Sequence, residues 1–177
     1  MNAEKQQSRP EVLLDPIVLL MHEHEEGMKY LDKLRDAADY IQANGFSFKA
    51  FEDVAEAIRF IDNEIRRHNE KEEKYLFPLV EVHVHGPGEV MHNEHRELWR
   101  AFKSLRECVK EVEEMKIYPT TVRDLIRLSH AIVDLLSNHI RKENEVFFPM
   151  AKNILTKDEY ELLTKEMNSI DRSHSCS

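Results

Sequence analysis

An eleven-residue segment occurs twice in this chain, with an offset of 71 residues. HNEKEEKYLFP begins at His68, and HIRKENEVFFP begins at His139. Each copy has a Glu four residues after its His, and a helix brings two such residues onto one face. The same offset relates His24 to His95, and each of these precedes the copy in its own half by 44 residues. The pattern predicts two copies of one helical hairpin, packed so that the repeated residues meet.

The rest of the chain favours helices. Only four Gly and six Pro occur in 177 residues, so long stretches lack turn-forming residues. Apolar residues recur at steps of three and four, the period of a helix with one inward face, and no stretch alternates as a strand does. We therefore predict an all-α fold: an antiparallel up-down four-helix bundle with a short C-terminal fifth helix.

Cap and turn residues give the bounds of this prediction. Asp15 and Ser47 are good helix caps, Gly45 is a stop signal, and Thr156 with Glu159 forms a capping box. The predicted parts are a flexible arm at 1–14, a bundle at 15–168 with hairpins at about 15–85 and 88–152 and a short helix at 157–167, and a disordered tail at 169–177.

The composition excludes several classes of function. The formal charge is −9, and no Lys/Arg cluster forms the basic face of a nucleic-acid binder. The acidic balance also disfavours anionic membranes, and no apolar run approaches the roughly 18 residues of a membrane span. The polar N-terminus lacks the apolar core of a signal peptide, and Cys108 and Cys176 form no disulfide framework. We expect a cytoplasmic protein that binds neither nucleic acid nor membranes.

The repeated His and Glu residues continue the apolar stripes of their helices, so they are predicted to point into the bundle. A buried carboxylate is very unfavourable unless it is protonated, paired or bound to a cation. The stripes carry no Lys or Arg, so a metal is the simplest partner. Two carboxylates shared by two metals, with two His on each, is a known way for a helix bundle to hold a dimetal centre. The candidate metal ligands are His24, His68, Glu72, His95, His139 and Glu143.

The donor atoms narrow the choice of metal. Six mixed nitrogen and oxygen ligands without a thiolate disfavour structural zinc, and the imidazoles disfavour calcium and magnesium. Imidazole with carboxylate suits iron, with manganese or zinc as substitutes. We therefore predict two iron ions. Each would have four protein bonds, which leaves positions for an oxo or hydroxo bridge and a small external ligand.

At these residues the chain resembles the hemerythrin-like, or HHE cation-binding, family. The resemblance covers residues 15–150 and includes all six candidate ligands and both Phe-Pro endings. It implies a four-helix bundle with a non-haem di-iron site bridged by Glu72 and Glu143. Oxygen-carrying hemerythrins have a fifth His, from H-x3-H on the third helix, and H-x4-D on the fourth. Here Met91 and Trp99 flank His95 at four residues, and the fourth helix has H-x3-E.

The four-His, two-Glu set is more similar to the branch that includes proteins for repair of nitrosatively damaged iron centres and catalase-like members. The resemblance therefore implies redox chemistry with oxygen, nitric oxide or hydrogen peroxide, in oxidative or nitrosative stress defence, and an oxidoreductase activity is one reading. The alternatives are a non-catalytic oxygen or iron sensor, an iron store or donor, and a metal-free interaction bundle. The electron donor and the oligomeric state stay open.

Four further residues are candidates for the surroundings of the metals. His92, three residues before His95, is either a fifth ligand or a donor that hydrogen-bonds to a ligand. Met28 and Trp99 occupy equivalent positions one turn beyond His24 and His95, and Met91 lies one turn before His95. We expect Met28 and Trp99 to pack in the core; alternatively they wall the open side of the metals. His174 and Cys176 are left without an assigned role.

Overall fold

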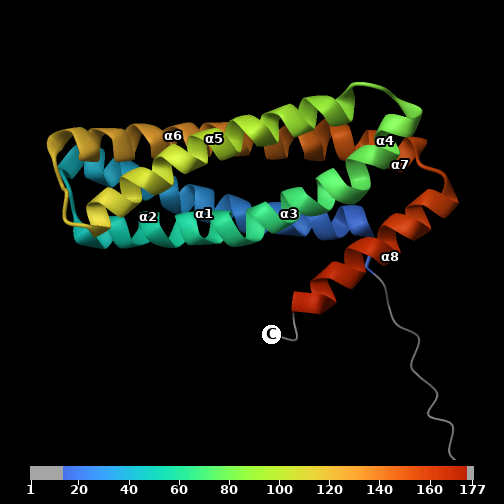
Figure 1. The fold of residues 1–177 in the computed structure, drawn as a ribbon, viewed down its shortest axis with the longest axis horizontal. Helices are drawn as coiled ribbons and strands as arrows, with labels where there is room; N and C mark the ends of the chain where they lie inside the picture. Colours follow the sequence, from blue (N-terminus) through green and yellow to red (C-terminus); the bar gives the residue numbers. More distant parts are fainter. Residues whose placement is uncertain (1–13, 175–177) are drawn as a thin grey trace, which may run out of the picture.

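A computed structural model describes residues 14–174, and these form helices and connections without a strand, which confirms the predicted all-α fold. Figure 1 shows the long helical stretches side by side, alternating in direction, with α8 crossing one end. The elements are α1 (Pro16–Asn44); α2 (Phe48–Phe60), η1 (Ile61–Ile65), α3 (Arg66–Lys71), η2 (Glu72–Leu76) and α4 (Phe77–His83); α5 (Pro87–Glu113); α6 (Pro119–Lys142), η3 (Glu143–Phe147) and α7 (Phe148–Ile154); and α8 (Lys157–His174). No helix in this part of the chain is both long and apolar enough to span a bilayer.

The helix ends follow the cap residues of the sequence. The Asp15 carboxylate accepts hydrogen bonds from the backbone N–H groups of Ile17 and Val18 at 2.9 and 3.1 Å, which fixes the start of α1. Gly45 follows the last residue of α1 with a φ of 86°, a conformation that favours Gly. The Ser47 hydroxyl accepts from the N–H of Ala50 at the start of α2.

Two of the three π-helical turns occupy equivalent places in the two halves. η2 and η3 begin at Glu72 and Glu143, 71 residues apart, and in each the N–H of the following Phe donates to the carbonyl of that Glu, five residues back. Pro78 and Pro149 come next. A Pro ring clashes with the carbonyl four residues before it in an α-helix, so the wider turn relieves this clash. η1 has no such counterpart, because residues 132–136 lie within the α-helix α6.

The apolar core consists of two clusters with a polar layer between them. Along α1, Leu20 belongs to the cluster at the α8 end and Leu31 to the larger cluster, and His24 lies between them. Along the second stretch, Ile65 belongs to the larger cluster and Leu76 to the one at the α8 end. The repeated His and Glu residues therefore lie where the two clusters meet.

The helix α8 closes the end of the bundle nearest this layer and runs to His174, seven residues beyond the predicted end at 167. Leu163 and Met167 are buried against the smaller apolar cluster. Beyond them, Asn168 donates to the carbonyls of Thr164 and Leu14. The helix continues through residues 169–174, which were expected in the tail. The predicted arm at 1–14, apart from Leu14, and the tail at 175–177 lie outside the described residues.

We expect Tyr160→Phe to lower the free energy of unfolding by about 1 kcal/mol, the usual net contribution of one hydrogen bond. The Tyr160 hydroxyl donates to Asp15 at 2.8 Å and so ties α8 to the residue that caps α1. Urea denaturation measures the change, and Tyr40→Phe is the control, because Tyr40 is 51% exposed. An equal loss in both variants would contradict a tie specific to Tyr160.

Candidate metal centre

The structure brings all six candidate ligands together in the polar layer. His24 lies near the start of α1 and His95 in the first half of α5, while the two His-Glu pairs lie at α3–η2 and α6–η3, near the end of the bundle that α8 crosses (Figure 1). All six side chains are buried. They form two groups that could each hold a metal: His24, His68, Glu72 and Glu143; and Glu72, His95, His139 and Glu143.

Each of the two carboxylates faces both halves of this cluster. Glu72 directs Oε1 at His68 Nε2, 3.3 Å away, and Oε2 at His95 Nε2, 3.6 Å away. Glu143 directs Oε1 at His139 Nε2, 3.0 Å away, and Oε2 at His24 Nε2, 3.2 Å away. One oxygen of each carboxylate therefore lies in each half, the arrangement that a bridging carboxylate requires.

The donor atoms converge in two groups, each of which could hold a cation. Among the described residues, both oxygens of Glu72, both oxygens of Glu143 and Nε2 of His68 are buried without a hydrogen bond. Such atoms are very unfavourable in a protein interior. His95 Nε2 and His139 Nε2 lie 2.8 Å apart, close to the roughly 3 Å expected for two nitrogens at right angles on one metal. The nitrogen and oxygen donors fit iron, with manganese or zinc as substitutes.

Protons balance the charge of the cluster when no metal is bound. Burial by itself lowers the pKa of His68, but the negative charge of Glu72 and hydrogen bonding with Glu23 outweigh it and raise this pKa to about 10. Burial likewise opposes protonation of His139, yet Glu143 and Glu94 raise its pKa to about 10. The pKa of Glu143 is lowered in turn by His139 and His24, against the effect of burial. A metal therefore has to displace protons from this site.

A second layer of side chains orients two of the imidazoles in the same way. Nδ1 of His68 donates to Glu23 at 2.8 Å, and Glu23 also binds the ammonium group of Lys71. In the other half, Nδ1 of His139 donates to Glu94 at 2.9 Å, and Glu94 accepts from Lys142 at 2.5 Å. The 71-residue offset relates His68 to His139, Glu23 to Glu94, and Lys71 to Lys142. Because Nδ1 is held outward, Nε2 is left to face the cluster.

The other two imidazoles are held from the opposite hairpin. Nδ1 of His24 bonds to Asn144 Oδ1 at 2.9 Å, and the ring lies parallel to Phe148, with centroids 5.4 Å apart. Nδ1 of His95 donates to Glu73 Oε1 at 2.7 Å, and its ring packs against Phe77 at 5.5 Å. Phe77 and Phe148 are the Phe residues of the two Phe-Pro endings. The Phe of each ending therefore packs against an imidazole of the other hairpin, and the Pro of each ending follows the wide turn that begins at the Glu.

Comparison with protein families decides the assignment. The family model for the hemerythrin HHE cation-binding domain matches residues 15–151, most of the chain and all six candidate ligands. This chain belongs to the hemerythrin family. The match begins at Asp15, the cap of α1, and ends within α7, before α8.

Curated relatives of this hemerythrin domain include iron-sulfur cluster repair proteins. The iron-sulfur cluster repair protein YtfE of Cronobacter sakazakii is 30% identical over 102 residues, which are 55% of this chain and 46% of that protein. The protein of the same name from Escherichia coli strain K12 is 25% identical over 144 residues, 78% of this chain and 64% of the relative. This chain thus spans about half to two thirds of the length of these relatives.

Sequence reasoning missed part of the second layer of this hemerythrin domain. The correspondence of Glu23 with Glu94 is visible in the sequence, but it does not by itself indicate a contact with His68 or His139. Asn144 gave no signal at all, because it lies at the position equivalent to Glu73 and has a different side chain. The 71-residue offset between Glu23 and Glu94 was the sequence signal that could have identified these two carboxylates as partners of His68 and His139.

His92 is not one of the donors that converge in this hemerythrin domain. Its side chain is 46% exposed, and Nδ1 lies 3.3 Å from Oε2 of Glu73, the carboxylate whose other oxygen holds His95. Neither group of candidate ligands among the described residues includes it. His92 therefore contacts Glu73, which itself contacts the ligand His95, and so His92 lies further from the cluster than a fifth ligand would.

The three apolar candidates pack in the core. Met28 and Trp99 pack against the larger cluster, and Met91 is buried in the smaller one. The Trp99 ring meets Phe102 edge to face, with centroids 5.3 Å apart, and the Arg66 guanidinium lies 4.1 Å from the Trp99 centroid. These contacts match the expected packing role for Met28 and Trp99.

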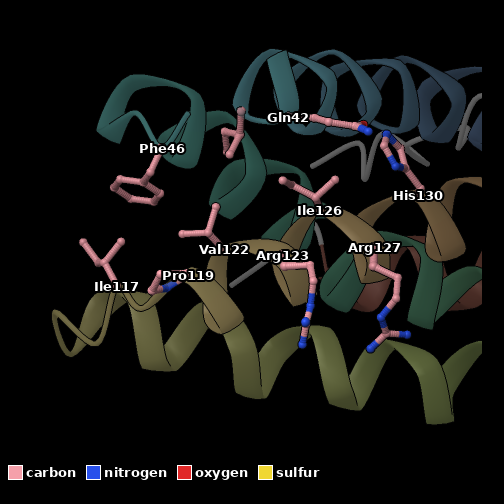
Figure 2. Close-up of a pocket in the computed structure, with 10 residues that line it drawn as sticks. Gln42, Phe46, Ile117, Pro119, Val122, Arg123, Ile126, Arg127 and His130 are labelled. Atoms are coloured by element: carbon pink, nitrogen blue, oxygen red, sulfur yellow. The ribbon is translucent and has the colours of Figure 1, made fainter. Parts of the chain in front are cut away.

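A pocket of about 680 Å³ lies far from the candidate metal centre. Figure 2 shows Phe46, Ile117 and Val122 around its apolar part, with His130 close to Gln42 on another side. Ile41, which also lines it, is 17 residues beyond His24 on α1, about 25 Å along the helix. This pocket therefore plays no part in the chemistry of the cluster.

Proposed function

We propose that this chain is a non-haem di-iron protein. His24 and His68 would hold one iron, His95 and His139 the other, and the carboxylates of Glu72 and Glu143 would bridge them. One observation carries the proposal: each buried carboxylate points one oxygen into each half of the cluster, and none of the four oxygens has a hydrogen bond within the described residues.

The chemistry of such a centre is redox chemistry with a small ligand. Iron held there would supply electrons and open coordination positions for oxygen, nitric oxide or hydrogen peroxide. The protein contributes the fixed direction of each Nε2, through the groups that hold Nδ1, and an apolar enclosure. Phe77 and Phe148 form part of that enclosure, and a dry surrounding strengthens every electrostatic interaction inside it.

The names of the relatives support a role in stress defence. They are called iron-sulfur cluster repair proteins, and oxygen, nitric oxide and peroxide are the agents that damage such clusters. We propose that this chain acts in the same setting. This chain spans only part of the length of those relatives. That it shares their activity is therefore a proposal.

Metal analysis and optical titration test the proposal. Protein loaded with ferrous iron without oxygen should hold about two irons per chain. Separate titrations with oxygen, nitric oxide and hydrogen peroxide should change its near-ultraviolet absorption. With an excess of an added chemical reductant to return the iron to the ferrous state, the ligand that is consumed over many cycles is the substrate. A preparation that binds no transition metal would contradict the proposal.

Iron donation is a second candidate, favoured by the relatives' names, because rebuilding an iron-sulfur cluster requires iron. In that case the iron-loaded chain should transfer iron to a metal-free iron-sulfur protein faster than free ferrous iron held by a chelator of equal affinity. Transfer without turnover of any of the three small ligands would favour donation over catalysis.

A further inference from the structure

The two halves of the candidate metal centre share most of their second layer. In each half, one imidazole donates through Nδ1 to a carboxylate that also binds a Lys: His68 to Glu23, and His139 to Glu94. Each carboxylate carries one negative charge and each Lys one positive charge. In this respect the two halves have the same arrangement of imidazole, carboxylate and ammonium group.

The remaining two imidazoles differ in what holds them. His24 bonds to the neutral amide oxygen of Asn144, whereas His95 donates to the carboxylate of Glu73. Asn144 and Glu73 occupy equivalent positions, since they differ by 71 residues and each follows the Glu of a His-Glu pair. The Glu73 side chain is 32% exposed, its Oε2 lies 3.3 Å from His92 Nδ1, and the positive charge of Arg96 also acts on it. The half with His95 and His139 thus has one more carboxylate in contact with its imidazoles.

A carboxylate behind an imidazole strengthens it as a metal ligand. It draws on the Nδ1 proton, increases the electron density at Nε2, and adds negative charge close to the cation. Partners of this kind typically change metal affinity by about 10- to 100-fold. A neutral amide holds the ring in the same direction but adds no charge. The direction of the difference is therefore fixed by the two residues.

We propose that Glu73 and Asn144 make the two halves unequal, so that the half with His95 and His139 binds a divalent metal more tightly and fills first. The inference rests on the proposed dimetal function. Glu73 and Asn144 act through the imidazoles and are positioning residues. The half with His24 and His68 is then the one that loses its metal first when metal is scarce.

Cobalt as Co²⁺ is the probe for the order of filling. Crystals of the metal-free chain with one equivalent of Co²⁺ should give an anomalous peak between His95 and His139 about 3 to 10 times stronger than the peak between His24 and His68, because two sites that share one equivalent differ in occupancy by the square root of their affinity ratio. With two equivalents, both peaks should be equal. Equal peaks at one equivalent would overturn the proposed order.

Exchanged side chains test whether Glu73 and Asn144 cause the order. Glu73→Gln and Asn144→Asp should each make the two peaks more equal, because each variant gives both halves the same number of carboxylates in contact with their imidazoles. The double variant should reverse the order, with the first peak between His24 and His68. An unreversed order in a folded double variant would overturn the roles of these residues.

Two further readouts keep the outcomes separate. Glu145→Gln is the matched control, since Glu145 is exposed beside Asn144 and should leave the order unchanged. Circular dichroism reports whether each variant is folded. The order of filling is also measured in wild-type crystals, so it is tested even where a variant does not fold. Failure to bind Co²⁺ in either half would overturn the proposed function and this inference together, whereas two equal sites would overturn the order alone.

Discussion

Glu72→Gln should bind at most about one metal ion per chain, where the wild type binds about two. The Glu72 oxygens face one imidazole in each half of the centre, so losing the carboxylate weakens both metal positions. A bound ligand at a thousand times its dissociation constant stabilises the folded state by about 4 kcal/mol per site. The metal-loaded variant should therefore lose about 4 kcal/mol of unfolding free energy. Elemental analysis and thermal melting measure the two effects.

Controls separate metal binding from the stability of the bundle itself. Without metal, Glu72→Gln should still fold but be less stable at neutral pH than the metal-free wild type, because it loses the Glu72 charge that raises the pKa of His68. The metal-dependent effect is therefore the difference between loaded and metal-free protein for each variant. Glu145→Gln, an exposed neighbour of the second copied segment, should behave as wild type with and without metal. Unchanged metal content and melting temperature in Glu72→Gln would rule out a shared carboxylate bridge.

Metal affinity should fall steeply as the pH decreases. His68 and His139 both have a pKa of about 10 without metal, so each carries a proton at neutral pH. Loading two metals therefore releases two protons, and the product of the two affinities should fall about 100-fold for each pH unit between pH 9 and 6.5. Competition with a chelator at several pH values measures this slope. His68→Gln should release one proton fewer, and a slope of zero in the wild type would contradict the protonated imidazoles.

The metal-free protein should show a different dependence of stability on pH. The fold raises the pKa of His68 and of His139 from 6.5 to about 10, so protonation of these residues stabilises the folded state. This contribution is complete below pH 6.5 and is lost as the pH rises through about 10. The pKa of Glu94 is lowered from 4.5 to about 2 by hydrogen bonds from His139 and Lys142, so its contribution is lost as the pH falls below 4.5. Metal-free protein should therefore be most stable between about pH 4.5 and 6.5.

The central cluster could be anticipated because its signal is long-range and repeated. A single His-Glu pair on a helix is a weak indication, but the common offset links His24 and His95 to the two pairs. The helix ends at Asp15, Gly45 and Ser47 were also predictable, because caps depend on residues next to each other in the sequence. Burial of the six side chains follows from their place on the apolar stripes.

Other features depend on contacts that the sequence does not display. Asn144 holds His24 only because the second hairpin packs across the first, and nothing near Asn144 in the sequence indicates this contact. The extra length of α8 depends on Asn168, a residue common in loops, which here bonds to Thr164 and Leu14. The exposed position of His92 could not be separated from a ligand position by spacing alone.

The wide turns η2 and η3 constrain how this segment can change in length. In a regular α-helix, residues five apart are rotated by about 140°, so Glu72 and Phe77 could not both face the interior. Both are buried here, because the extra residue of the turn brings them to the same side. A deletion or insertion between Glu72 and Pro78 would turn either the Glu72 carboxylate or the Phe77 ring away from the interior. The segment is therefore free to exchange side chains but not to gain or lose residues, and Glu73 with Asn144 is such an exchange.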